Sequence, residues 1–189
     1  MIGLNVTIPY KESVLQYLDE ISDDANTIGA VNCIKILVGK LIGYNTDAFG
    51  FEESLANFVD KKIDMAFVLG TGGSSKAIQF VLHKMNIPFQ LVSSKNKERA
   101  IAYSEIESHL GATNLYINTT PLGMFPETGN CPDIPYNKLT ERDFLFDLIY
   151  NPAETLFLKK GKQQGCKTEN GLEMLKLQAE KSWEIWNRE

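Results

Sequence analysis

The chain has 189 residues, of which 43% are hydrophobic and 23% charged. This composition is typical of an ordered globular protein, because the apolar content is large enough to offset the conformational entropy lost on folding. The 24 acidic and 19 basic residues give a net charge of −5, which argues against nucleic acid as the main partner. No apolar run approaches the ~20 residues of a membrane span, and the amino terminus does not resemble a signal peptide. The length allows one large domain or two small ones.

Few residues of the kinds that hold metals or form disulfides are present. Cys33, Cys131 and Cys166 are widely spaced and odd in number, which favours reduced thiols and a cytoplasmic protein. The only histidines, His83 and His109, belong to no cluster with cysteine. No metal site is therefore expected.

The first part of the chain predicts a small mixed unit. Residues 4–8 carry apolar side chains at alternate positions and predict a short strand. Residues 9–21 carry apolar side chains at helical spacing and predict a helix that begins near Pro9. Residues 29–45 predict a hairpin with its turn at Gly39-Lys40.

From residue 46 onward the pattern changes to alternating helices and strands. A helix over 46–60 leads to an apolar strand over 64–70, a glycine-rich turn and a second helix. Further strands are expected at 88–94, 114–118 and 144–150. Strands that alternate with helices indicate βαβ units, and hence a parallel sheet covered by helices.

The last segment, 170–187, predicts a helix. We expect its two tryptophans to pack into the core. The apolar residues of this segment are Leu172, Leu175, Leu177, Ala179, Trp183 and Trp186.

The glycine-rich turn is a candidate anion site. Free N–H groups and the helix dipole at the start of a helix both favour a phosphate there. Gly70 and Gly72 fit the dinucleotide-binding pattern G-x-G-x-x-G/A, whereas Ser75 occupies the third position. The alternative is a plain connection from strand to helix.

The end of the next strand indicates which dinucleotide would bind. An NAD site usually has an acidic residue there, whereas NADP prefers basic groups. The segment after Ser93 contains Ser94, Lys95 and Arg99, with no acidic residue before Glu98. Lys95 and Arg99 favour the 2′-phosphate of NADP; the alternative is that this charged stretch is a solvated loop.

A set of short motifs, in order along almost the whole chain, resembles shikimate dehydrogenase. They are Asn5 to Lys11 (NVTIPYK), Gly29 to Asn32 (GAVN), Gly43 to Asp47 (GYNTD), the glycine turn 70–74, Asn118 to Met124 (NTTPLGM), Asp147 to Pro152 (DLIYNP), and Asn170 to Leu172 (NGL) with Gln178-Ala179. The resemblance implies a Rossmann-type parallel-sheet domain with a smaller α/β substrate lobe. It also implies reversible, NADPH-dependent reduction of 3-dehydroshikimate to shikimate, in aromatic amino acid biosynthesis.

The resemblance also implies roles for individual residues. Lys11 and Asp47 match the catalytic pair. The residues that match substrate-binding positions are Thr7, Asn32, Asp47, Tyr150 and Gln178. Those that match cofactor-binding positions are Gly70, Thr71, Gly72, Gly73, Ser74, Ser94, Lys95, Arg99, Leu148 and Gly171.

The chemistry of this reaction suits a lysine and a carboxylate. Hydride transfer to a ketone leaves a developing alkoxide, which needs a proton donor and a positive charge nearby. An ammonium group supplies both. Taken singly, Lys11 also fits an exposed helix residue, and Asp47 also fits an acid that stabilises a helix N-terminus.

The chain departs from the family in its glycine turn and at its start. Thr71 and Ser74 stand where alanines are common, and Ser94-Lys95-Asn96 replaces the usual Asn-Arg-Thr. The family has a further strand–helix unit upstream of Met1, so we expect an incomplete substrate lobe with an exposed apolar edge, and a homodimer is one way to cover it. The alternatives are an NADP-binding remnant without turnover, or a quinate/shikimate dehydrogenase that uses NAD. We expect residues 1–45 and 171–189 to form the substrate lobe and 46–170 the NADP-binding domain.

Overall fold

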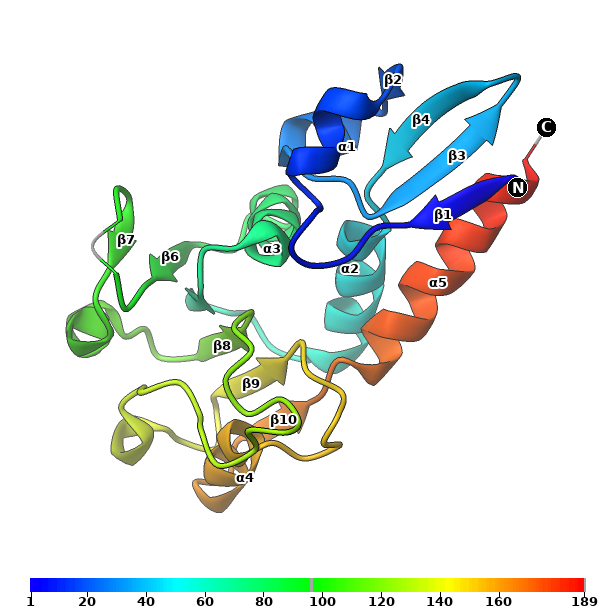
Figure 1. Ribbon diagram of the computed structural model, residues 1–189. Coiled ribbons are helices and arrows are strands. Elements are labelled where there is room, and N and C mark those ends of the chain that lie inside the picture. The colour runs from blue at the N-terminus through cyan, green and yellow to red at the C-terminus, as the bar shows by residue number, and fades with distance from the viewer. Residues whose placement is uncertain (96, 189) are drawn as a thin grey trace.

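The computed structural model describes residues 1–95 and 97–188, which form two β-sheets flanked by helices (Figure 1). Two residues of the predicted units lie outside the described residues: Asn96, in the predicted phosphate-binding turn, and Glu189, at the end of the predicted substrate lobe. None of the helices in the described ranges is long and apolar enough to span a membrane.

The larger sheet has six parallel strands in the order β10-β9-β8-β5-β6-β7. The strands are β5 (Met65–Leu69), β6 (Phe89–Val92), β7 (Ala100–Ile101), β8 (Asn114–Asn118), β9 (Phe144–Asp147) and β10 (Lys167–Glu169). The predicted parallel sheet is confirmed, with β5, β6, β8 and β9 at the predicted places. The short edge strands β7 and β10 carry no apolar run that would have predicted them.

Helices cover both faces of this sheet. Side chains alternate along β5: Ala66 and Val68 pack with α2 and α3, whereas Phe67 and Leu69 share a core with Phe157 of α4. The helices on the first face are α2 (Thr46–Phe58) and α3 (Gly73–Lys84); those on the second are η2 (Tyr103–His109), η3 (Tyr136–Lys138) and α4 (Leu156–Gln163). The predicted helices over 46–60 and after the glycine turn are confirmed; α4 was not predicted.

The smaller sheet has four strands in the order β1-β3-β4-β2. They are β1 (Gly3–Asn5), β2 (Glu20–Ile21), β3 (Cys33–Leu37) and β4 (Lys40–Tyr44). The predicted hairpin is confirmed as β3 and β4, but its turn lies one residue earlier, at Val38 (φ 50°) and Gly39 (φ 80°). Positive φ at both positions matches the twist of paired strands. The strand predicted over 4–8 ends at Asn5, and Ile8 is exposed.

The helix predicted over residues 9–21 is wrong. This segment forms a short 3-10 helix, η1 (Ser13–Tyr17), and then β2, which pairs with β4. The backbone is extended at Leu18, and Asp19 N–H donates to the Leu41 carbonyl at 2.9 Å. The predicted apolar side chains still pack into the small core of this lobe, so the spacing identified the buried residues but not the element. Helix α1 (Asp23–Ile28) follows, capped by Ser22.

Helix α5 (Leu172–Asn187) returns to the smaller sheet and packs along α2 (Figure 1). The two helices approach closely at Gly50, where a Cβ atom would lie 2.6 Å from the Met174 carbonyl oxygen. The buried face of α5 is Met174, Ser182 and Ile185. The predicted apolar face is therefore wrong in part: Trp183 is 64% exposed, whereas its neighbour Ser182 is buried against α2, with its Oγ 3.0 Å from Thr46 Oγ1. Trp186 does pack, and its Nε1 donates to the Ile34 carbonyl at 2.9 Å.

Candidate functional site

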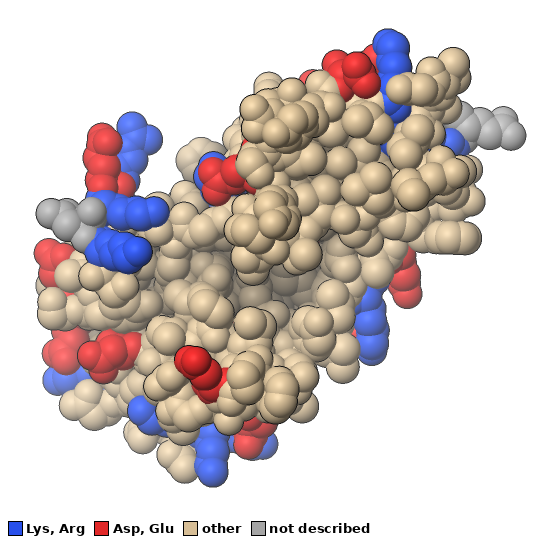
Figure 2. Space-filling model, in the orientation of Figure 1, with Lys and Arg blue, Asp and Glu red and all other residues tan. Residues whose placement is uncertain are grey.

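A cavity of about 1050 Å³ separates the smaller sheet from the carboxyl ends of the larger sheet's strands. Figure 2 shows it as a hollow near the middle of this face of the molecule. Open parallel sheets bind ligands at this edge. The predicted site residues that line it are Thr7, Lys11, Asn32, Asp47, Gly70, Thr71, Gly72, Gly73, Ser74, Leu148, Tyr150, Gly171 and Gln178.

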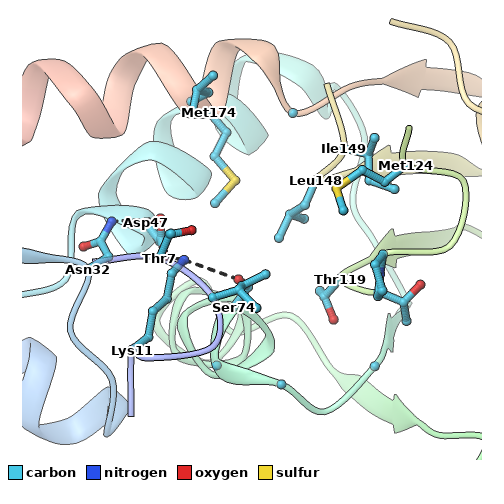
Figure 3. Close-up of a pocket in the computed structure, with 18 of the residues that line it drawn as sticks. Thr7, Lys11, Asn32, Asp47, Ser74, Thr119, Met124, Leu148, Ile149 and Met174 are labelled. Carbon is cyan, nitrogen blue, oxygen red and sulfur yellow. Dashed lines mark hydrogen bonds and ion pairs between the residues drawn. The ribbon is translucent and has the colours of Figure 1, made fainter. Parts of the chain in front are cut away.

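Lys11 and Asp47 form an ion pair inside this cavity, with 2.6 Å between Nζ and Oδ2. Both side chains are largely buried, with exposures of 12% and 11%. Asp47 lies in the first turn of α2, where the helix dipole favours a carboxylate. A second contact of Lys11 reaches the glycine turn, since Nζ lies 3.5 Å from Ser74 Oγ (Figure 3). The ammonium group therefore lies between the two sheets.

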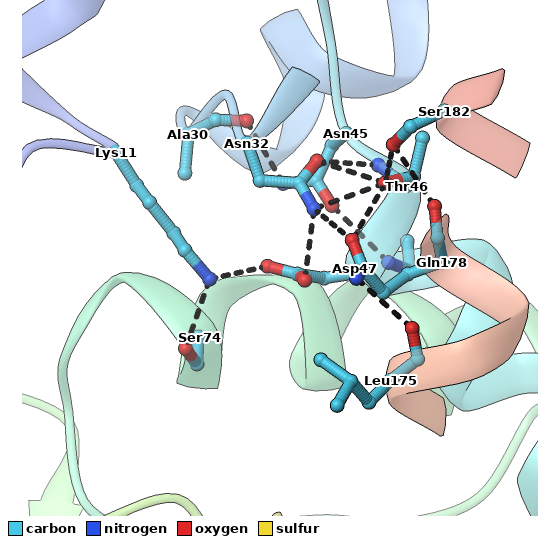
Figure 4. Close-up of polar contacts among 11 residues, drawn as sticks. Lys11, Ala30, Asn32, Asn45, Thr46, Asp47, Ser74, Leu175, Gln178 and Ser182 are labelled. Atoms are coloured by element: carbon cyan, nitrogen blue, oxygen red, sulfur yellow. Dashed lines mark hydrogen bonds and ion pairs between the residues drawn. The ribbon is translucent and has the colours of Figure 1, made fainter. Parts of the chain in front are cut away.

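Asn32 fixes the Asp47 carboxylate from the other side (Figure 4). Its Nδ2 donates to Asp47 Oδ1 at 2.9 Å and to Gln178 Oε1 at 3.3 Å, and its Oδ1 accepts from the Thr46 N–H at 2.7 Å. Thr46 Oγ1 in turn lies 3.0 Å from Ser182 Oγ on α5. This network joins the loop before β3 to α2 and α5, and it brings Gln178 close to the Lys11–Asp47 pair as predicted.

The glycine turn lines the cavity at the N-terminus of α3. Helix α3 begins at Gly73, and no side chain of the described residues caps its N-terminus. Gly70 has φ of +109°, and a Cβ there would lie 2.8 Å from Thr119 Oγ1, so glycine is required at this position. A Cβ on Gly72 would meet nothing within 4 Å. The turn therefore leaves an open, positively polarised site at the start of a helix.

The opposite wall comes from the loops after β8 and β9. Thr119, Thr120 and Met124 line the cavity from the first loop, and Ile149 and its neighbours from the second. Gly171 packs directly against the Leu148 carbonyl, leaving no room for a side chain, and its N–H donates to the Ile149 carbonyl at 3.1 Å.

The predicted 2′-phosphate residues lie apart from the cavity lining. Ser94, Lys95 and Arg99 are exposed and follow the carboxyl end of β6. Figure 2 shows basic side chains gathered at the end of the molecule where β6 and β7 lie. The Gly70 N–H donates to the Val92 carbonyl at 2.9 Å, so this strand end adjoins the glycine turn.

Sequence reasoning missed three features of the site. Thr46 and Ser182 complete the polar network; Thr46 directly precedes Asp47 in a motif, whereas Ser182 carried no signal. Met174 lines the cavity from α5. Lys76 of α3 pairs with Glu12 at 2.6 Å and forms a second link between the two sheets.

Within residues 1–95 and 97–188, no group of three or more histidine, cysteine or acidic side chains is arranged to hold a metal ion.

A family model and the sequences of known proteins match this chain to the same family. The family model described as the shikimate dehydrogenase substrate binding domain matches residues 1–34. The shikimate dehydrogenase (NADP(+)) of Methanococcus maripaludis is 41% identical over 97% of this chain and 71% of its own length.

Solved structures match nearly the whole chain. The chorismate mutase/shikimate 5-dehydrogenase fusion protein from Clostridium acetobutylicum is 41% identical, with a TM-score of 0.86 over 98% of this chain and 71% of that one. Shikimate 5-dehydrogenase from Thermus thermophilus, solved with NADP(H) and shikimate, is 31% identical, with a TM-score of 0.88 over 99% of this chain and 73% of that one. By sequence over nearly its whole length and by fold, the chain belongs to the shikimate dehydrogenase family.

Proposed function

We propose that this chain catalyses the reversible, NADPH-dependent reduction of 3-dehydroshikimate to shikimate, in keeping with relatives that are named shikimate dehydrogenase (NADP(+)). The observation that carries the proposal is the Lys11–Asp47 pair, held at 2.6 Å within one cavity that the glycine turn also lines. A proton donor and a dinucleotide-binding turn that share a cavity are what reduction of a ketone requires.

The residues present fit NADP. The uncapped N-terminus of α3 and the open space beside Gly72 suit a pyrophosphate, which gains from free N–H groups and the helix dipole. Lys95 and Arg99, with Ser94, are assigned to the 2′-phosphate. Leu148 and Gly171 are assigned to the nicotinamide side of the cavity. When bound, NADPH supplies the hydride for the ketone carbon.

Lys11 supplies the proton. Its ammonium group donates to the substrate oxygen as negative charge develops there, and its positive charge stabilises that oxygen. Asp47 holds the ammonium in position. In the direction of oxidation the neutral Lys11 amine takes the proton of the substrate hydroxyl, the reverse of the step in reduction. Thr7, Asn32, Tyr150 and Gln178 are assigned to the remaining substrate hydroxyls, because they line the same cavity.

We assign residues 1–45 and 171–189 to a substrate lobe and residues 46–170 to an NADP-binding domain.

The proposed setting is the cytoplasm, since Cys33, Cys131 and Cys166 are free thiols. A homodimer is also part of the proposal, because among the described strands β1 pairs with β3 alone, and Ile2 beside it is 51% exposed. Light scattering on the purified chain tests the dimer: a monomeric mass at micromolar concentration would contradict it.

The activity is tested by following shikimate oxidation at the nicotinamide absorbance with NADP⁺. We expect turnover with shikimate and NADP⁺ that exceeds turnover with quinate and NAD⁺. Faster turnover of quinate with NAD⁺ would assign the other polyol acid and cofactor. Thermal stabilisation by NADP⁺ without any turnover would identify a binding protein and contradict the proposed reaction.

A further inference from the structure

Asp147, at the end of β9, is a fully buried carboxylate outside the cavity lining. Its carboxylate accepts three hydrogen bonds. Asn118 Nδ2 and the Ile149 N–H each donate to Oδ1 at 3.0 Å, and Thr155 Oγ1 donates to Oδ2 at 2.6 Å. No lysine or arginine of the described ranges forms an ion pair with it. A buried charge balanced only by neutral donors is costly, so its place in the fold needs a reason.

The three donors connect Asp147 to both loops of the cavity's far wall. Asn118 Oδ1 accepts from the Thr120 N–H at 3.0 Å and from Thr120 Oγ1 at 2.6 Å, and its Nδ2 also donates to the Leu122 carbonyl at 3.3 Å. The Ile149 N–H begins the second loop. Thr155 caps α4, into which that loop leads. One carboxylate therefore holds two segments that line the cavity, without reaching the cavity itself.

We propose that Asp147 is a positioning residue that sets the spacing of the two wall loops, 119–124 and 148–151, and thereby tunes the affinity for NADP and substrate. This inference rests on the proposed function for the identity of the ligands. The carboxylate can hold the loops in place because hydrogen bonds to an ionised acceptor are about twice as strong as those between neutral groups. The charge stiffens both loops at once, because the Asn118 and Ile149 donors share one oxygen.

The ionisation state of Asp147 gives this role a pH signature. Burial raises the pKa of Asp147 to about 6, and the three hydrogen bonds oppose that rise. The groups that contact the carboxylate are neutral: Asn118 at the end of β8, the Ile149 N–H and Thr155, which caps α4. The Asp147 charge contributes to the raised pKa of Tyr136 in η3, but burial is the main cause and keeps the pKa of that phenol far above neutral. Below about pH 6 Asp147 gains a proton and its three charge-assisted bonds weaken.

The test compares two buried aspartates at opposite ends of β9. Asp147→Asn removes the charge but keeps the shape. Asp143→Asn is the matched control: Asp143 is also buried and accepts from Asn114 and Thr140, at the end of the strand remote from the cavity. NADP⁺ affinity by calorimetry and KM and kcat for shikimate oxidation are measured for the parent and both variants from pH 5.5 to 8.

We expect Asp147→Asn to raise the Kd and KM for NADP⁺ roughly three- to tenfold at pH 7.5, with a smaller change in kcat, while Asp143→Asn leaves both constants unchanged. The parent's Kd should rise as pH falls through 6, and that of Asp147→Asn should stay flat. Thr155→Val and Thr155→Ser provide a second pair in case Asp147→Asn does not fold: the valine variant should bind NADP⁺ more weakly, and the serine variant should restore binding.

Equal constants for the parent, Asp147→Asn and Thr155→Val, or the same pH dependence in the parent and Asp147→Asn, would overturn the inference alone. Absence of both NADP⁺ binding and turnover in the parent would overturn the proposed function, and this inference with it.

Discussion

Lys11 reaches the cavity from a turn, not from a helix. The Tyr10 N–H donates to the Thr7 carbonyl at 2.9 Å, and the Lys11 carbonyl accepts from the Val31 N–H at 2.8 Å. These bonds anchor the backbone on both sides of the ammonium group, while Asp47 anchors its tip. The side chain therefore arrives pre-positioned, which is the main requirement for efficient proton transfer.

Replacement of Lys11 by alanine should reduce turnover of shikimate by roughly 100-fold or more, the scale of a lost proton donor. The affinity for NADP⁺ should hardly change, because the glycine turn and the basic residues after β6, which are assigned to the cofactor phosphates, lie outside the segment that carries Lys11. Steady-state kinetics and calorimetry on the parent and Lys11→Ala check both parts. Equal turnover in the two proteins would remove Lys11 from the catalytic role.

The basic residues after β6 should discriminate between the two nicotinamide cofactors. Lys95→Ala combined with Arg99→Ala should weaken NADP⁺ binding by ~1–3 kcal/mol for each charged hydrogen bond lost. Binding of NAD⁺, which has no 2′-phosphate, should be almost unaffected and serves as the internal control. Equal losses for both cofactors, measured by calorimetry, would show that these side chains do not contact the 2′-phosphate.

At the scale of elements, the contact of α2 with α5 holds the site together. Asp47 and Thr46 begin α2, Gln178 and Ser182 lie on α5, and Asn32 of the loop before β3 bonds to both helices. The close approach at Gly50 makes these hydrogen bonds possible, since it brings the backbones of the two helices together.

Gly50→Ala should therefore destabilise the protein although alanine favours helices. The added Cβ would lie 2.6 Å from the Met174 carbonyl oxygen, a backbone atom that cannot move aside alone. We expect a loss of about 1–3 kcal/mol in the free energy of unfolding, as for other overpacked sites, together with a higher KM for shikimate. Gly129→Ala is the control, because a Cβ at Gly129 meets nothing within 4 Å. Equal stability of the two variants in urea unfolding would contradict the tight crossing.

At the scale of the whole molecule, Asp147 links stability to pH. Its pKa is raised to about 6 in the folded protein from 3.8, so the folded state holds the proton more tightly than the unfolded state. This contribution to stability is full below about pH 4 and is lost as pH rises through 6. Relative to Asp147→Asn, the parent should lose roughly 1–3 kcal/mol of unfolding free energy between pH 4 and 7. A constant difference between the two proteins across this range would contradict the raised pKa.

The two sheets should also differ in local stability. The central strands of the larger sheet are buried on both faces, whereas the smaller sheet has a small core and several exposed apolar side chains. Amide hydrogen exchange should be slow at 64–70, 88–93 and 114–118 and faster throughout 1–45. Equal protection in both regions would show that the two sheets unfold together.

The sequence by itself determined the parallel sheet, the glycine turn and many of the residues that line the cavity, because these depend on local apolar runs and short motifs. Tertiary structure decided how residues 13–21 fold, since pairing of β2 with β4 outweighs their helical spacing. It also decided which face of α5 is buried, through the bond between Thr46 and Ser182. The distance from Lys11 to Asp47 and the three donors around Asp147 follow from the packing of segments far apart in sequence. The periodicity of apolar residues predicts which side chains are buried. The hydrogen-bond partner of each buried polar group depends on how the helices and strands pack together.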